Sequence, residues 1–249
     1  MKEVGAASRL RLVALALLAW ALAGAAPSDR YEADRRALIR EIENDVRDTA
    51  QYLNRRELDA RVLRALDDVP RHEFVLPQDR ALAYENRPLP IGHGQTISQP
   101  YIVAVMTDLV EPAVGCRALE VGTGSGYQAA VLSRLCESVH TLEIIEPLGK
   151  SARQRVARLG YRNVSVRVAD GYYGWEEEAP YDVIVVTAVA SHIPPPLLRQ
   201  LKPGGRMVLP VGTRFTAQEL VLVNKDADGR ITTRQVLPVS FVPLTGEHG

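Results

Sequence analysis

Hydrophobic positions follow a helical period in the first third of the chain and lose it afterwards. Between residues 29 and 66, apolar side chains recur every three or four positions among many charged ones, as at Leu38, Ile42 and Val46. This spacing predicts two or three amphipathic helices, with a break near Asn54, that form a cap on a core. Residues 70–100 are rich in proline and glycine but also in aromatic and apolar side chains, which predicts a long, ordered loop.

From residue 116 onwards, short apolar runs alternate with stretches of helix length. Strands are predicted at 118–121, 139–145, 164–168 and 181–186, and helices at 126–136, 148–159 and 195–201. Strands separated by helices imply right-handed crossovers and a parallel sheet that is covered on both faces. We therefore expect a doubly wound, Rossmann-like α/β core.

The last third of the chain predicts antiparallel strands. Lys202–Gly205 has the composition of a turn, and apolar runs follow it at 206–211, 219–223 and 231–241. Asp228-Gly229 between the last two runs is a strong hairpin signal. The expected fold class is thus α/β, with a mostly parallel sheet, antiparallel C-terminal strands and an N-terminal helical cap.

The N-terminus has the pattern of a secretory signal. Basic residues precede an uninterrupted apolar run at 12–23, and the small residues Ala21/Ala23 and Ala23/Ala25 are both workable cleavage pairs. This pattern predicts a signal peptide over 1–25, cleaved after Ala25, and an exported protein in the periplasm. An uncleaved anchor is less consistent with so short a run, and the protein is cytoplasmic if the segment is not used. We expect 26–100 to form one domain with the core at 101–249.

Composition excludes several function classes. The chain has 249 residues, 30 basic and 30 acidic, and 46% of its residues are hydrophobic, which is ordinary for a folded protein. A formal charge of zero gives no broad attraction to nucleic acid. Two cysteines are too few for a disulfide scaffold or a multi-cysteine zinc module, and no histidine spacing predicts a metal site. We expect Cys116 and Cys136 to be buried free thiols, with a bridge as the alternative.

A glycine-rich turn is the first candidate for chemistry. Three alternating glycines, Gly122, Gly124 and Gly126, follow Glu120 where a predicted strand passes into a helix. Such a turn lets a ligand approach the backbone closely and directs helix amides at it. The dinucleotide fingerprint needs its third glycine at position 127, which is Tyr127 here. The spacing therefore argues against a nicotinamide or flavin.

Two acidic residues follow the next strands along the chain. Glu143 lies 19 residues beyond Gly124, where a carboxylate can accept both hydroxyl protons of a ribose. Asp170, beside Gly171, ends the third strand and could receive the amino protons of an adenine. In open α/β sheets the carboxyl ends of neighbouring strands line one crevice. The combination predicts a nucleoside site.

These motifs resemble a known family. The segment Glu120–Tyr127 is similar to the first motif of class I S-adenosylmethionine-dependent methyltransferases. More specifically, the chain resembles the protein-L-isoaspartate (D-aspartate) O-methyltransferase family, from about residue 57 to the C-terminus. Val69–Val75 and Leu89–Pro100 support this resemblance, and the part from Gly92 to Pro100 is specific to the family. Leu201–Gly205 and Phe241–Leu244 extend the match.

The resemblance implies a set of roles. S-adenosylmethionine would be held by Glu120, Gly122, Thr123, Gly124, Ser125, Gly126, Glu143, Asp170 and Gly171. Ser98 matches the active-site serine that binds the isoaspartyl carboxylate, with Thr96 and Ile97 beside it. The Val242 backbone is a weaker candidate for gripping the substrate peptide. The partners implied are damaged proteins with isoaspartyl residues, and we expect a monomer without nucleic acid or stable membrane association.

The sequence departs from the family in two places. Val189 stands where alanine is usual, with Ser191-His192 after it, which bears on substrate fit. The export signal is the second departure, because this cofactor is made in the cytosol. Two other functions stay open: a methyltransferase for another carboxylate or a small molecule, and a binding module that has lost catalysis.

Overall fold

The computed structural model describes residues 30–213 and 216–246. The chain divides into two compact units, residues 1–35 and residues 36–249. The expected signal peptide, residues 1–25, lies outside the described residues. Within the described ranges, no helix has both the length and the apolar character needed to cross a membrane.

The predicted N-terminal helices are present. They are α2 (Glu32–Asp48), α3 (Ala50–Leu53) and α4 (Ala60–Asp68), and α2 buries Leu38, Ile42 and Val46 as its spacing predicts. Helix α3 ends at the expected break, because Asn54 takes a left-handed conformation with φ 56°. Helix α4 begins where the Asp59 carboxylate accepts a hydrogen bond from the backbone N–H of Arg61, which caps the first turn.

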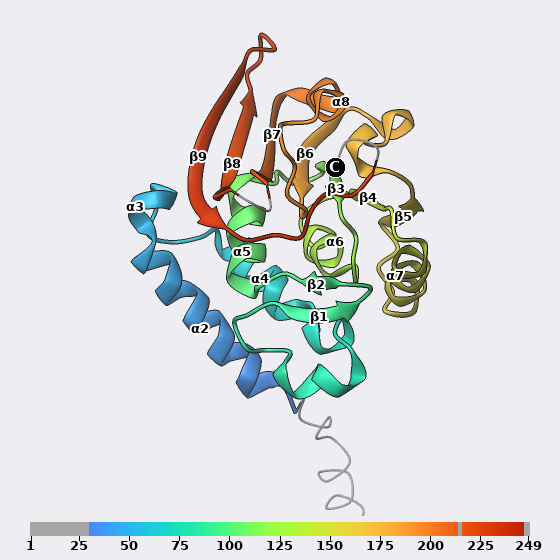
Figure 1. The fold of residues 1–249 in the computed structure, drawn as a ribbon. Helices are drawn as coiled ribbons and strands as arrows, with labels where there is room; N and C mark the ends of the chain where they lie inside the picture. The colour runs from blue at the N-terminus through green and yellow to red at the C-terminus, as the bar shows by residue number, and fades with distance from the viewer. Residues whose placement is uncertain (1–29, 214–215, 247–249) are drawn as a thin grey trace, which may run out of the picture. The chain divides into compact units, whose positions relative to one another are not determined.

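The core is a seven-stranded sheet in the order β5-β4-β3-β6-β7-β8-β9 (Figure 1). Its strands are β3 (Arg117–Val121), β4 (Ser138–Glu143), β5 (Val164–Val168), β6 (Tyr181–Val186), β7 (Leu201–Val211), β8 (Gln218–Lys225) and β9 (Ile231–Val239). Pairing is parallel from β5 through β7, and antiparallel between β7, β8 and β9. This confirms the expected mostly parallel sheet with an antiparallel end.

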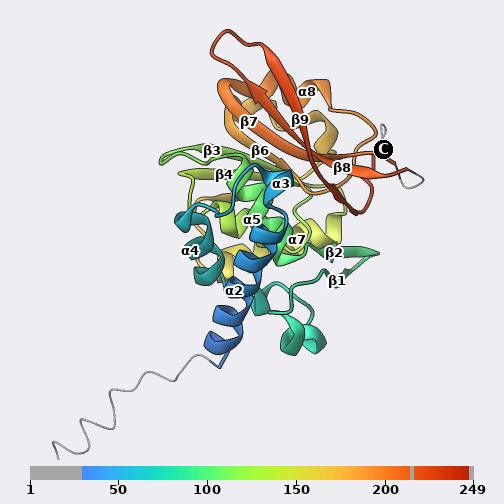
Figure 2. The same ribbon diagram turned by 90° about the vertical axis from the view of Figure 1, so that its left-hand side faces the viewer.

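Helices cover both faces of the sheet. They are α5 (Pro100–Leu109), α6 (Tyr127–Leu132), α7 (Glu146–Arg158) and α8 (Pro195–Gln200). Figure 2 shows α5 and α7 on one side of the sheet and α8 on the other. The chain steps outward from β3 to β5 and then returns to β6 on the other side of β3. Right-handed crossovers in opposite directions therefore put helices on opposite faces.

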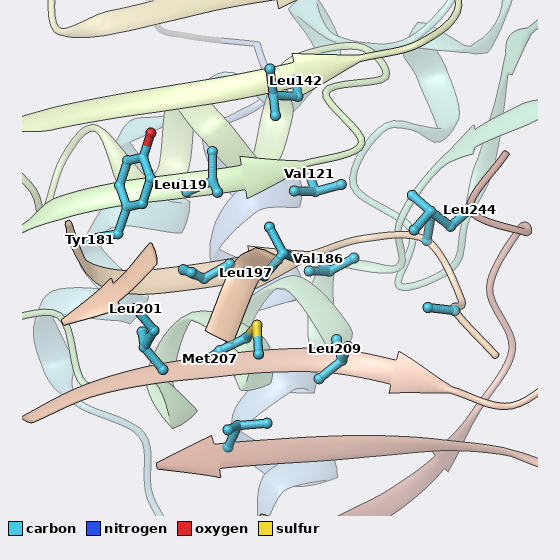
Figure 3. Packing of buried hydrophobic residues seen from close by; sticks show 14 of the residues in the cluster. Leu119, Val121, Leu142, Tyr181, Val186, Leu197, Leu201, Met207, Leu209 and Leu244 are labelled. Atoms are coloured by element: carbon cyan, nitrogen blue, oxygen red, sulfur yellow. The ribbon is translucent and has the colours of Figure 1, made fainter. Parts of the chain in front are cut away.

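The hydrophobic core beside α8 is built from inward-facing strand residues (Figure 3). Leu119, Ile184 and Met207 from three neighbouring strands are fully buried there, against Leu197 of α8. Strands buried on both faces need continuous apolar runs, which is why β3 and β6 are recognisable in the sequence.

Residues 70–100 are an ordered loop, as predicted. It contains two short 3₁₀ helices, η1 (Arg71–Glu73) and η2 (Pro77–Leu82), and a small hairpin of β1 (Leu89–Gly92) and β2 (Gln95–Ile97). The hairpin turn contains His93 with φ 54°, between two glycines that also have positive φ. The hairpin leads directly into α5, which the sequence patterns did not single out.

The segment predicted as a turn, Lys202–Gly205, lies within β7. Strand pairing passes from Tyr181↔Leu201 to Val183↔Arg206, so these four residues form an irregularity beside β6. Gly204 has φ 81°, which gives the local bend that proline and glycine predict. Proline and glycine thus predict the bend, but β7 pairs with β6 both before and after it.

The two cysteines form a disulfide, so the expectation of free thiols was wrong. Cys116 precedes β3 and Cys136 follows α6, 20 residues later, with 4.5 Å between their Cα atoms. The chain returns to this point because β4 starts beside β3, and the backbone N–H of Glu137 donates to the Cys116 carbonyl. The 20-residue spacing does not reveal this closeness, since it depends on the packing of α6.

Candidate active site

A cleft lies at the carboxyl ends of β3, β4 and β6. Because β3 has β4 on one side and β6 on the other, the connections after β3 and β6 leave in opposite directions. Open α/β sheets bind ligands at such a switch point. The cleft is lined by the loop after β3, by the end of β4, by the β1–β2 hairpin and by the chain after β9.

The glycine turn forms the floor of the cleft. The amides of Gly122 and Thr123 both donate to the Leu142 carbonyl on β4, so the turn bends over the neighbouring strand. Gly122 has φ 99°, and a Cβ atom there would lie 2.5 Å from the Thr187 hydroxyl oxygen. Only glycine therefore allows the chain after β6 to lie this close to the turn.

The Glu143 carboxylate lies across from this turn. Its Oε2 accepts a hydrogen bond from the Gly124 amide at 2.7 Å, and its Oε1 accepts one from the Ile145 amide at 2.9 Å. A carboxylate has about four acceptor positions, so further hydroxyl donors can still bind. The backbone thus fixes a buried carboxylate that retains acceptor capacity towards the cleft.

Glu120 is a second buried acid in the lining. Its Oε2 accepts a hydrogen bond from the Thr141 hydroxyl, which also contacts the Thr123 hydroxyl at 2.6 Å. Its Oε1 is buried and has no hydrogen-bond partner among the described residues. Burial raises the pKa of Glu120 to about 8, with the Thr141 hydrogen bond acting in the opposite direction.

The predicted substrate residues line the same cleft. Thr96, Ile97 and Ser98 enter it from the β1–β2 hairpin, and Val242 enters it from the chain after β9. A second, more apolar cavity adjoins the first and shares Thr96, Ser98, Thr187 and Val242 with it. Ser98 therefore lines both cavities.

The chain after β9 forms one wall of the cleft. The Val189 amide donates to the Val242 carbonyl at 2.9 Å, and the Leu244 amide donates to the Val189 carbonyl at 2.8 Å. Val189 itself is buried and does not line the cleft. Val189 therefore contacts the wall through its backbone, whereas Ser191 and His192 are exposed.

Two predicted cofactor residues do not line the cleft. Gly126 is the N-cap of α6, and its Cα faces Val156 of α7. The Asp170 carboxylate accepts a hydrogen bond from the Tyr172 amide at 2.9 Å, which caps η3 (Gly171–Tyr173), and it lies against Gly246. The other predicted residues, Glu120, Gly122, Thr123, Gly124, Ser125, Glu143 and Gly171, all line it.

Sequence reasoning missed some lining residues. Gln128 is buried in the first turn of α6, its Nε2 donates to the Thr107 hydroxyl at 2.9 Å, and its Oε1 has no partner in the described chain. A glutamine directly after the glycine turn is a signal that could have been used. Ile144 had no comparable signal, since strand order brings it here. Within the described ranges, no cluster of acids, histidines or cysteines could hold a metal.

Comparison with known proteins identifies relatives over nearly the whole chain. A protein from Syntrophobacter fumaroxidans, protein-L-isoaspartate O-methyltransferase 2, is 60% identical over 234 residues, which cover 93% of this chain and 95% of the relative. A protein of the same name from Polaromonas is 62% identical over 211 residues, 85% of this chain and 100% of that one.

Solved structures share the fold. A protein-L-isoaspartate O-methyltransferase aligns with a TM-score of 0.75 and 30% identity, over 86% of this chain and 67% of the other. A Plasmodium falciparum protein, solved in complex with S-adenosyl-L-homocysteine, aligns with a TM-score of 0.69 at 24% identity, over 88% of this chain and 99% of the other. A family model for protein-L-isoaspartate (D-aspartate) O-methyltransferase matches residues 46–249. The chain therefore belongs to the protein-L-isoaspartate (D-aspartate) O-methyltransferase family.

Proposed function

We propose that this protein transfers a methyl group from S-adenosylmethionine to the free carboxylate of L-isoaspartyl residues, and of D-aspartyl residues, in damaged proteins. The resulting methyl ester cyclises to a succinimide that reopens partly to normal aspartate, so methylation starts repair. The observation that carries the proposal is the position of Ser98, which lines both the cleft of the glycine turn and the adjoining cavity. The names and high identity of the relatives support the same reaction.

The polar groups of the cleft fit the cofactor. Glu143 retains acceptor positions suited to ribose hydroxyls, beside the amide of Gly124. The unpartnered oxygens of Glu120 and Gln128 are buried in the lining, where an ammonium group would satisfy them. We assign the adenine side to Asp170 and Gly171: Gly171 lines the cleft, and the Asp170 carboxylate next to it caps η3.

The protein's task in this reaction is placement. When bound, S-adenosylmethionine supplies an activated methyl group on a sulfonium. A carboxylate with a pKa of about 4 is already ionised at neutral pH, so no general base is required. The Ser98 hydroxyl can orient a carboxylate oxygen without neutralising it. The Val242 wall and the β1–β2 hairpin flank this position and limit the access of water.

Matched peptides test the proposed reaction. An isoaspartyl peptide should be methylated and its aspartyl twin should not, in an assay that follows methyl transfer from the cofactor. Equal turnover of both peptides, or turnover of small carboxylates alone, would refute isoaspartate repair. Titration calorimetry with S-adenosylhomocysteine addresses the binding-module alternative, because a protein that has lost the cofactor site releases no heat.

The Ser98→Ala variant tests the role of the serine. We expect lower turnover of the isoaspartyl peptide with nearly unchanged affinity for S-adenosylhomocysteine, since Ser98 would touch the acceptor. An equal loss of turnover and affinity would show that Ser98 supports the fold instead.

We also propose that the protein is exported to the periplasm after cleavage of residues 1–25. The basic start and short apolar run of this segment favour export. The Cys116–Cys136 disulfide favours it independently, because structural disulfides persist mainly in oxidising compartments. N-terminal sequencing of the protein from fractionated native cells should find a chain that starts at Ala26 in the periplasm. An intact Met1 terminus in the cytoplasmic fraction would refute export.

We propose a monomer as the working form. The glycine turn, Glu143 and Ser98, on which the proposed reaction depends, lie together within a single copy of the chain. Light scattering during size-exclusion chromatography should give the mass of a single chain, and turnover per chain should not depend on protein concentration. A dimer that loses activity on dilution would contradict this.

A further inference from the structure

Arg71 is a completely buried arginine outside the lining of the cleft. It opens η1 in the loop between α4 and the β1–β2 hairpin, and its residue exposure is 0%. Burying a charged side chain costs free energy unless partners compensate it. The groups that contact the Arg71 side chain therefore indicate its role.

The guanidinium connects distant parts of this loop. Its Nε donates to the Ala83 carbonyl at 2.9 Å, and its Nη2 donates to the Ser98 carbonyl at 2.8 Å and the Arg87 carbonyl at 3.4 Å. The bond to Ser98 spans 27 residues of sequence. Arg71 thus fixes the backbone of the residue that the proposed function places against the acceptor carboxylate.

The charge of Arg71 is not compensated by an acid. Within the described residues no carboxylate forms an ion pair with it, and its Nη1 is buried without a hydrogen-bond partner. Its Cζ lies 4.8 Å from the ring centroid of Tyr127, a residue of the cleft lining. Burial lowers the pKa of Arg71 to about 10, so the side chain stays cationic at neutral pH.

We propose that Arg71 is a positioning residue for the acceptor: it holds Ser98 in place and directs a buried positive charge at an anionic group bound there. This inference rests on the proposed function, which puts a carboxylate beside Ser98. The carbonyl dipoles and the Tyr127 ring satisfy the cation only in part, and an anion at Ser98 would complete its environment. A loop that needed only hydrogen bonds could use a neutral side chain.

Two variants separate charge from hydrogen bonding. Arg71→Met removes both, whereas Arg71→Lys keeps the charge and loses the planar set of donors. Arg153→Met is the control, because the exposed Arg153 also donates hydrogen bonds from its guanidinium to the backbone, to the Val166 carbonyl, away from the cleft. For each protein we would measure KM and kcat for an isoaspartyl peptide, calorimetric affinity for S-adenosylhomocysteine, and hydrogen exchange of the amides of residues 95–99.

The inference predicts different results for the three variants. Arg71→Met should raise KM about tenfold or more, as expected when a buried charged hydrogen-bond donor is lost. Arg71→Lys should recover part of that loss. The affinity for S-adenosylhomocysteine should stay unchanged in both. Exchange at residues 95–99 should accelerate in Arg71→Met and not in Arg153→Met.

Several results would overturn the inference. Equal KM values for Arg71→Lys and Arg71→Met would remove the role of charge, and a parallel loss of cofactor affinity would show a merely structural arginine. Exchange needs no substrate, so unchanged exchange in Arg71→Met refutes the positioning by itself. A wild-type protein that methylates no isoaspartyl peptide refutes the proposed function instead, which keeps the two failures distinguishable.

Discussion

At the scale of single residues, Glu120 shows how burial in the cleft lining disfavours the ionised form of a carboxyl group. The carboxyl is 1% exposed, and only one of its oxygens has a hydrogen-bond partner in the described chain. Its raised pKa follows from this burial. Because its pKa in the folded protein lies above the usual value, folding favours the protonated form.

Comparison with the Glu120→Gln variant should show that protonation of Glu120 makes the stability of the wild-type protein depend on pH. The stabilising contribution of protonated Glu120 is complete below its unfolded pKa of 4.5 and is lost as pH rises through its folded pKa of about 8. Relative to Glu120→Gln, the wild-type protein should therefore lose unfolding free energy between about pH 5 and about pH 9. Urea denaturation of both proteins across this range measures the difference. A constant difference would show that Glu120 titrates normally.

At the scale of elements, the glycine turn and the chain after β6 constrain each other. The Thr187 hydroxyl donates to the carbonyls of Val121 and Gly122, at 3.1 and 2.8 Å. It therefore ties the ends of β3 and β6 together where the cleft begins. This contact leaves no room for a side chain at Gly122.

The Gly122→Ala variant should disturb both elements. Its Cβ would displace Thr187, so we expect lower thermal stability and weaker binding of S-adenosylhomocysteine. Gly160→Ala is the control, because Gly160 has φ 80° but open space around its Cα. That variant should lose only about 1 kcal/mol, the backbone cost of the left-handed conformation. Thermal melts and calorimetry distinguish the two, and equal effects would mean that the contact with Thr187 is unimportant.

The sequence predicted the elements well where one local signal determines them. Apolar runs identified β3 and β6, and the glycine turn and Glu143 were placed at the ends of their strands. Asp170 also follows its strand as expected, and its carboxylate caps η3, while its role toward the cofactor stays a prediction. The signals failed where packing decides. Helix α5 lacks an amphipathic pattern because nearly all of its residues are buried.

At the scale of the whole molecule, the disulfide is the feature that local patterns could not predict. It joins the start of β3 to the chain before β4 and closes a loop around α6. A cross-link of this spacing stabilises a protein by about 3 kcal/mol, mainly by restricting the unfolded chain.

The double variant Cys116→Ser/Cys136→Ser should therefore unfold more easily. We expect a loss of about 3 kcal/mol, which corresponds to a melting temperature lower by roughly 6–12 °C for a chain of this size. Reduced wild-type protein should match the variant, and affinity for S-adenosylhomocysteine should persist well below the melting temperature. Equal stability of the oxidised protein and the variant would show that the bridge does not support the fold.

The residues that line the cleft are as far apart in the sequence as Thr96 and Val242. No single hairpin or βαβ unit holds enough of it to recognise a nucleoside. The cofactor should therefore bind only when the entire sheet has formed, and a partly folded intermediate should not bind it. In a denaturant titration, protection by S-adenosylhomocysteine would then disappear together with the last strand contacts, in one cooperative step.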